Sequence, residues 1–126
     1  MTKTTALRTV VQEILEGTVP LDEPVYYQQA EKESPGAYVV YTLDEVMRED
    51  ERTTLELEVN VIDYGLSTSD CETLADNIQA AFDKKYVATD DIGVYFYIDR
   101  RNSVTEEDRR IIRRRLLFTT YLYERG

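Results

Sequence analysis

The spacing of apolar residues predicts a helix near the start of the chain. The apolar positions that share one helical stripe are Leu7, Val10, Val11, Ile14 and Leu15. They recur at i, i+3, i+4, i+7 and i+8, which places them on one face of an α-helix. Gly17 is expected to end this helix as a left-handed residue, since Pro20 and Pro24 forbid its continuation. We interpret the stripe as a core-packing face.

The same period returns in residues 67–86 and predicts a second helix. Its apolar stripe comprises Cys71, Leu74, Ala75, Ile78 and Phe82. Ser69 and Glu72 have the spacing of a capping box at its start, and Lys84 and Lys85 would complement the helix dipole near its end. Because Cys71 belongs to the stripe, it is expected to be a small core residue rather than a reactive thiol.

Strand-like alternation marks three further segments. In residues 53–63 the apolar positions are Leu55, Leu57, Val59 and Val61, and the polar ones are Glu56, Glu58 and Asn60. One buried face and one acidic, hydrated face are typical of an antiparallel sheet. Residues 37–43 and 92–98 are also rich in β-branched and aromatic residues, and a shorter extended piece is expected at 25–27. The charged stretches 44–52 and 99–109 are interpreted as a solvated hairpin loop and a connector.

Residues 110–123 fit two interpretations. As a helix they would start from a cap at Thr105. As a strand, which the run LLFTTYLY favours, they present two faces. One face carries Ile112, Leu116, Phe118 and Leu122, and the other carries Ile111, Arg113, Arg115, Thr119, Tyr121 and Tyr123. We favour the strand.

The predicted order of elements is helix, strand, strand, helix, strand, strand. We therefore expect a single α+β domain over residues 1–126, in which two helices cover one face of an about four-stranded sheet that is largely antiparallel or mixed. The apolar face of residues 53–63 should pack under the second helix, with the first helix in the same core.

Composition and missing motifs narrow the chemistry. The 126 residues include ten tyrosines, one cysteine and no histidine, so an internal disulfide, a histidine base and a histidine ligand are all excluded. The five glycines are scattered, so no phosphate-binding loop is present. We therefore expect a non-enzymatic protein without cofactor or metal. The start of the chain is no secretory signal and no apolar run could span a membrane, which suggests a soluble protein of a reducing cytoplasm.

Charge is divided unevenly along the chain. The formal net charge of −10 combines −14 on residues 1–99 with +4 on residues 100–126. The basic part centres on RRIIRRRLLF, residues 109–118, which holds five arginines. Three roles are open for them: pairs with Glu56 and Glu58 across the sheet, contacts with carboxylates of a neighbouring subunit, or nucleic-acid binding.

The two protein-contact roles define the candidate site residues. The candidate subunit interface comprises Arg109, Arg113, Arg115, Glu56 and Glu58. The candidate partner-contacting loop contains Val46, Met47 and Arg48. DNA is the least favoured partner because the net charge repels phosphate, and because alternation sends Arg114 to the face opposite Arg113 and Arg115.

The order of patterns resembles a known family. An amphipathic N-terminal helix and a proline-bearing extended piece precede PGAYVVYTL, TTLELEVNVID, the helix CETLADNIQAAFD, and a last hairpin from IGVYFYIDRR to RRRLLFTTYLYE. Over nearly the whole chain this is similar to the small tail-terminator (tail-completion) proteins of the head–tail joining neck in long-tailed bacteriophages and prophages.

The resemblance implies a structural role in virion assembly. Such proteins form a ring, commonly hexameric, that caps the head-proximal end of the tail tube, ends its polymerisation and docks to the head. The implied partners are further copies of the chain, the tail tube protein and a head connector or neck protein. DNA passes through without specific binding, no membrane is involved, and the protein resides in the virion neck or, during assembly, in the host cytoplasm. A ring needs heterologous contacts, which two oppositely charged parts of the chain suit.

Two alternatives stay open. One is another phage neck or minor tail protein, such as a head-completion or connector protein. The other is a nucleic-acid-binding module that uses the arginine run at 109–115, which salt-dependent DNA binding would identify.

Overall fold

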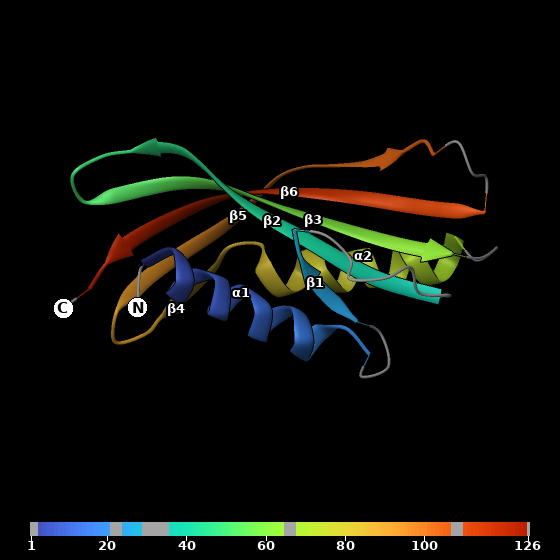
Figure 1. Ribbon diagram of the computed structural model, residues 1–126, viewed down its shortest axis with the longest axis horizontal. Helices are drawn as coiled ribbons and strands as arrows, with labels where there is room; N and C mark the ends of the chain where they lie inside the picture. Colours follow the sequence, from blue (N-terminus) through green and yellow to red (C-terminus); the bar gives the residue numbers. More distant parts are fainter. Residues whose placement is uncertain (1–2, 21–23, 29–35, 65–67, 107–109, 126) are drawn as a thin grey trace.

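The computed structural model describes residues 3–20, 24–28, 36–64, 68–106 and 110–125. Its elements are α1 (Lys3–Thr18), β1 (Val25–Tyr27), β2 (Gly36–Arg48), β3 (Arg52–Tyr64), α2 (Thr68–Phe82), β4 (Lys85–Ala88), β5 (Ile92–Val104) and β6 (Ile111–Glu124). The strands form one sheet in the order β1-β2-β3-β6-β5-β4. β1 is parallel to β2, and all other neighbours are antiparallel. Figure 1 shows that the sheet is strongly twisted.

The expected fold class is wrong. Instead of an α+β domain with about four strands in the order α-β-β-α-β-β, the described chain is mostly β, with a six-stranded mixed sheet and two helices. The additional strands are β1 and β4, which lie at opposite edges. Each is too short to show a clear alternation, so only pairing with a longer neighbour defines it as a strand. Residues 110–123 do form a strand, as favoured above, and not a helix.

Both helices end differently from the prediction. α1 continues through Gly17 to Thr18, so Gly17 is not a left-handed terminator. α2 stops at Phe82, and Lys84 takes a left-handed conformation with φ 63° that turns the chain into β4. Lys84 and Lys85 therefore follow the helix instead of occupying its last turn.

Two charged stretches are strands and not loops. Residues 44–48 belong to β2, and only the turn at 49–51 separates it from β3. Residues 99–104 belong to β5 and pair with β6 as far as Val104, opposite Arg113. A charged residue fits a strand when its backbone finds partners and its side chain reaches water. The expected loop at 44–52 and connector at 99–109 are therefore wrong over these stretches.

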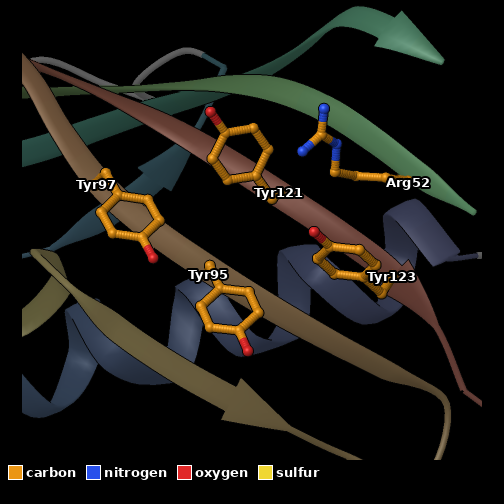
Figure 2. A pocket seen from close by; sticks show the side chains of 5 residues that line it. All are labelled: Arg52, Tyr95, Tyr97, Tyr121 and Tyr123. Atoms are coloured by element: carbon orange, nitrogen blue, oxygen red, sulfur yellow. The ribbon is translucent and has the colours of Figure 1, made fainter. Parts of the chain in front are cut away.

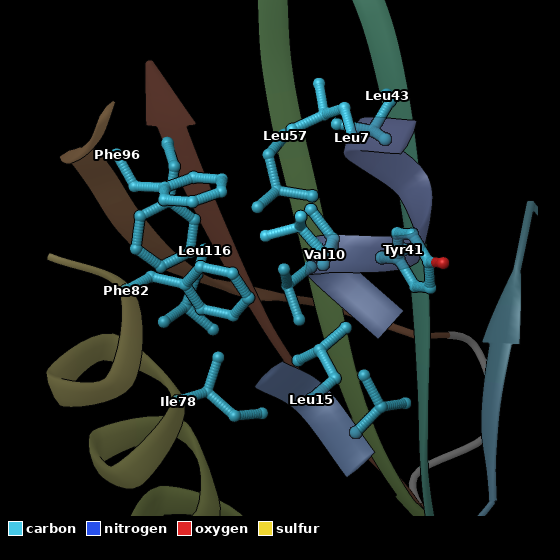
Figure 3. Close-up of a cluster of buried hydrophobic side chains, with 14 of the residues drawn as sticks. Leu7, Val10, Leu15, Tyr41, Leu43, Leu57, Ile78, Phe82, Phe96 and Leu116 are labelled. Carbon is cyan, nitrogen blue, oxygen red and sulfur yellow. The ribbon is translucent and has the colours of Figure 1, made fainter. Parts of the chain in front are cut away.

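Both helices lie on one face of the sheet, and the core fills the space between the helices and the sheet (Figures 1 and 3). Leu57 pairs with Phe118 and Val59 with Leu116, so the central strands point these side chains toward the helices. The predicted core is confirmed. One buried cluster contains Leu7, Val11, Leu55, Leu57, Val59, Val61, Leu74, Ile78 and Phe82, with Ile14 packed against it.

Phe82 seats α2 on the centre of the sheet. Its ring centroid lies 5.0 Å from that of Phe96 on β5 and 5.3 Å from that of Phe118 on β6. Cys71, on the same helix, is fully buried and donates from Sγ to the carbonyl oxygen of Val61 at 3.8 Å. Burial raises the pKa of its thiol to about 11. The prediction that Cys71 is a core residue is confirmed, and its burial agrees with an unreactive thiol.

Ion pairs fix α2 at the margin of the core. Glu72 accepts from Nε of Arg114 and, at 2.8 Å, from Nη2 of Arg101, while Asp76 lies 2.6 Å from Nη1 of Arg101. The two arginines come from β6 and β5. Glu72 thus binds the sheet, and Ser69 lies within the helix, so the predicted capping box is wrong.

Candidate functional site

The sheet face opposite the helices carries its side chains in a banded order. We call it the open face. Paired residues of neighbouring strands share a face, so the register defines rows across the sheet. Along β3 the open face bears Arg52, Thr54, Glu56, Glu58, Asn60 and Ile62, and the partners on β6 are Tyr123, Tyr121, Thr119, Leu117, Arg115 and Arg113. From one end to the other, the open face is therefore aromatic, then acidic, then basic.

Five tyrosines form the aromatic end, where β4, β5 and β6 lie side by side. The tyrosine end comprises Tyr86, Tyr95, Tyr97, Tyr121 and Tyr123. The Tyr95 ring is central, with centroids 4.4 Å from Tyr86, 6.4 Å from Tyr97 and 6.0 Å from Tyr123. Tyr95 and Tyr97 remain 37% and 40% exposed. Tyrosines that combine an exposed ring with a polar tip are enriched in protein interfaces.

An open hollow of about 640 Å³ lies within the tyrosine end (Figure 2). Arg52 borders it, with its guanidinium 4.8 Å from the ring centroid of Tyr121 and Nη2 donating to Glu49 at 3.0 Å. Nε of Arg52 is buried and has no hydrogen-bond partner among the described atoms. Rings, hydroxyls and an already paired guanidinium suit recognition of a partner better than acid–base chemistry.

Acidic residues occupy the middle of the open face. Asp44 on β2 pairs with Glu56 on β3, and Glu58 lies opposite Leu117 on β6. Leu117 is only 2% exposed although it points away from the helices, and it lies between Glu58 and Arg100 of β5 in the register. The stems of such long side chains cover apolar surface while their charges stay in water. We call Asp44, Glu56 and Glu58 the acidic band.

Arg113 and Arg115 mark the basic end of the open face. Arg113 donates from Nε to Asn60 at 2.9 Å, and its Nη1 lies 3.1 Å from a carboxylate oxygen of Glu106. Arg115 donates from Nε to Asn102 at 3.2 Å. Each arginine is thus oriented by neighbours on its own chain and remains partly exposed. We call Arg113 and Arg115 the arginine band.

The structure answers part of the prediction for the arginine run. Arg114 points to the helix face, opposite Arg113 and Arg115, as alternation predicts. Among the described ion pairs, Arg113 is joined to Glu106, and neither Arg113 nor Arg115 is joined to the glutamates of β3 that the sequence offered. Arg109 lies outside the described residues. A role of the arginine band and of Glu56 and Glu58 as a subunit interface stays a prediction.

The predicted partner-contacting residues lie at the end of β2. Val46 and Met47 are 66% and 56% exposed, and Arg48 is held by Glu45 through Nε at 2.8 Å. The strand bulges between Glu45 and Met47, and Met47 then lies opposite Thr54, in the row that leads to the tyrosine end. Exposed apolar side chains beside aromatic ones suit a contact surface. That a partner binds there stays a prediction.

The tyrosine end was missed by reasoning from the sequence. Tyr95 and Tyr97 alternate on one strand, and Tyr121 and Tyr123 alternate on another, so the signal was present. The two pairs meet only because β5 and β6 are neighbours, and Tyr86 joins them through β4, which was not predicted.

The described part of the chain offers neither a metal site nor a membrane-spanning helix. Within it, no three acidic or cysteine side chains are grouped so that they could hold a metal ion. Its helices are also too short or too polar to cross a membrane.

The fold of this chain is similar to that of a protein chain of known structure, although its sequence matches no family model. No protein-family model matches the chain, and no curated protein matches its sequence. The structure is similar to a chain in a solved structure described as "Virion of native gene transfer agent (GTA) particle", with a TM-score of 0.59 and 13% sequence identity. The alignment covers 96% of this chain and 91% of that chain.

Proposed function

We propose that the chain is a structural protein of a phage-like virion and not an enzyme. The observation that carries this proposal is the likeness of the fold, over nearly the whole of both chains, to a component of a gene transfer agent particle. A banded, partly exposed sheet face adds support, because contiguous aromatic and charged surface is typical of protein contact.

Within that class we propose a tail terminator, a ring on the head-proximal end of the tail tube that ends tube growth and joins tail to head. The order of sequence patterns supports this role. The proposed partners are further copies of the chain, the tail tube protein and a head connector or neck protein. The net charge of −10 suits a conduit through which DNA passes, since an acidic wall repels phosphate.

The open face is our proposed assembly surface. Its arginine band would lie level with the acidic band of a neighbouring copy, so that Glu56 and Glu58 attract Arg113 and Arg115 across the junction. The exposed end of β2, with Val46 and Met47, would contact a tube or connector protein. Charged contacts of this kind select partner and orientation more than they add affinity.

Locating the protein and measuring tails tests the proposal. Antibody labelling of purified particles should place the protein at the junction of head and tail. Deleting its coding sequence should give tails of uncontrolled length that are not joined to heads. Tails of normal length without heads would instead indicate another neck protein. Particles that carry no label and assemble normally without the gene would refute a virion role.

A further inference from the structure

The two longest outer strands have edges that are only partly covered. β1 pairs with residues 39–41 of β2, and β4 pairs with residues 93–96 of β5. Among the described strands, none pairs with the outer side of residues 42–48 or of residues 99–104. We call these segments the β2 edge and the β5 edge. An unpaired edge offers backbone N–H and C=O groups to which another strand can bind.

The outward backbone groups of the β2 edge can be identified. The Val39 N–H donates to the carbonyl oxygen of Pro24 at 3.0 Å, and the Tyr41 C=O accepts from the N–H of Gln28 at 2.8 Å. Pro24 and Gln28 flank β1, so the backbone N–H and C=O groups of odd-numbered β2 residues face outward. The antiparallel pattern carries this alternation on to Leu43 and Glu45. Their N–H and C=O groups therefore point away from β3.

The two edges match in direction. β2 and β5 run antiparallel to each other, because three antiparallel pairings connect them through β3 and β6. If the sheet continues into a second copy with the helices on the same side, the β5 edge of one copy meets the β2 edge of the next in antiparallel orientation. Such a contact joins two different surfaces, as a ring requires.

The edges also match in position. The β2 edge lies toward the tyrosine end and the β5 edge toward the arginine band, so the two copies must be offset by about four residues, or about 13 Å at 3.3 Å per residue. With this offset, β4 of one copy lies level with the turn at 49–51 of the next, past the end of its β2. Neither β1 nor β4 then obstructs the junction.

Unused opposite charges lie on the two edges. Asp44 on β2 and Arg100 on β5 are both exposed, and among the described residues neither has an ion-pair partner. Asp44 pairs with Glu56 and Arg100 with Leu117, so both project from the open face. A continued sheet would therefore place them on the same side of the junction, where opposite charges on neighbouring strands stabilise pairing.

We propose that copies of this chain assemble by antiparallel pairing of the β5 edge of one copy with the β2 edge of the next. The four-residue offset places Asn102 opposite the neighbour's Asp44 and Arg100 opposite its Met47, so Arg100 is the diagonal neighbour of Asp44, within reach of a long side chain. The proposal rests on the ring assembly proposed above and specifies its subunit contact. The offset also brings Arg115 into the row of the neighbour's Glu56, and Arg113 into the row of its Glu58, about three strand spacings or 14 Å away. The acidic band of one copy thus lies level with the arginine band of the next.

A proline substitution tests the backbone contact. Glu45→Pro removes an outward N–H without touching the β2–β3 ladder, and an edge strand tolerates proline at such a position. Glu45→Ala is the matched control, because both variants lose the Arg48 pair and only one loses the N–H. In sedimentation velocity runs on the purified chain, Glu45→Pro should raise the dissociation constant of self-association about tenfold, because it removes one hydrogen bond and leaves the partner's carbonyl oxygen unsatisfied. Glu45→Ala should stay close to the parent.

A charge exchange tests the side-chain contact. Asp44→Arg and Arg100→Asp should each weaken self-association. The double variant in one chain, and an equal mixture of the two single variants, should both restore it, because each again offers opposite charges at every junction. Restoration would separate a direct contact from a general effect of net charge.

Three results would overturn the proposal: an association that Glu45→Pro leaves unchanged, single charge variants that the exchange does not rescue, or a parent chain that stays monomeric at millimolar concentration. In the last case the bulges and charges of both edges would be protection against pairing, their usual role. The proposed virion role is judged separately, by particle labelling and tail length.

Discussion

Removing the ring of Phe82 tests how firmly α2 is seated on the sheet. The side chain is fully buried and contacts the rings of Phe96 and Phe118 from the helix side. Phe82→Ala loses the transfer free energy of the ring and leaves a cavity between helix and sheet, a combined cost of about 3–5 kcal/mol. Against a typical total stability of about 5–15 kcal/mol, such a loss would leave the chain marginally folded.

A graded series makes the Phe82 prediction sharper. Phe82→Leu keeps much of the volume and loses two aromatic contacts, each worth about 0.5–1.5 kcal/mol, so it should cost roughly half as much as Phe82→Ala. Asn77→Ala, on the exposed face of the same helix, should stay within about 0.5 kcal/mol of the parent. Urea unfolding followed by far-ultraviolet circular dichroism gives all three values. A loss below about 1 kcal/mol for Phe82→Ala would refute the packing of α2 on the sheet.

Three further predictions concern the core, the ion pairs and the arginine band. Val59→Asp buries an unpaired charge and should cost roughly 3–5 kcal/mol; a parent-like melting curve would disprove the register of β3. The hydrogen bond from Arg114 holds the pKa of Glu72 in the folded chain below its ordinary value. The Glu72 carboxylate therefore stabilises the fold at pH values above its pKa in the unfolded chain, about 4.3. This stabilisation is lost as the pH falls through the lower pKa of the folded chain. The stability advantage of the parent over Glu72→Gln should therefore hold at neutral pH and shrink in acid. The double variant Arg113→Glu with Arg115→Glu should melt close to the parent, since exposed ion pairs are worth about 0–1 kcal/mol. It should nevertheless weaken self-association or the capping of tail tubes. Tight, salt-sensitive DNA binding by the parent that this variant abolishes would favour a nucleic-acid role.

Local patterns were sufficient for the buried elements. The stripes of both helices and the alternation in 53–63 correctly identified the residues of the core, because burial on one face leaves a period in the sequence. The charged residues 99–104 form a strand for a reason that lies elsewhere in the chain, namely the backbone partners that β6 supplies. β4 was missed because Lys84 and Lys85 extend the apparent helix, and only the left-handed turn at Lys84 reveals its end.

The open face was predictable only in fragments. Alternation placed Arg113 and Arg115 on one face and Arg114 on the other, and the structure agrees. The banding requires the strand order, which places β6 between β3 and β5. No local signal encodes that order, since β3 and β6 are separated by α2, β4 and β5 along the chain. The tyrosine end and the two open edges therefore emerge only from the three-dimensional arrangement.

The central place of β6 has a consequence for synthesis. β1, β2 and β3 lie on one side of it and β5 and β4 on the other, so β6 alone joins the two parts of the sheet. Its residues follow those of every other element. On the ribosome, the nascent chain therefore carries two separate half-sheets until its last strand emerges, and such unpaired strand edges favour aggregation. A chain terminated before residue 111 would contain two parts of the sheet with no strand to join them. Such a truncated product should be degraded by proteases before it can enter an assembly.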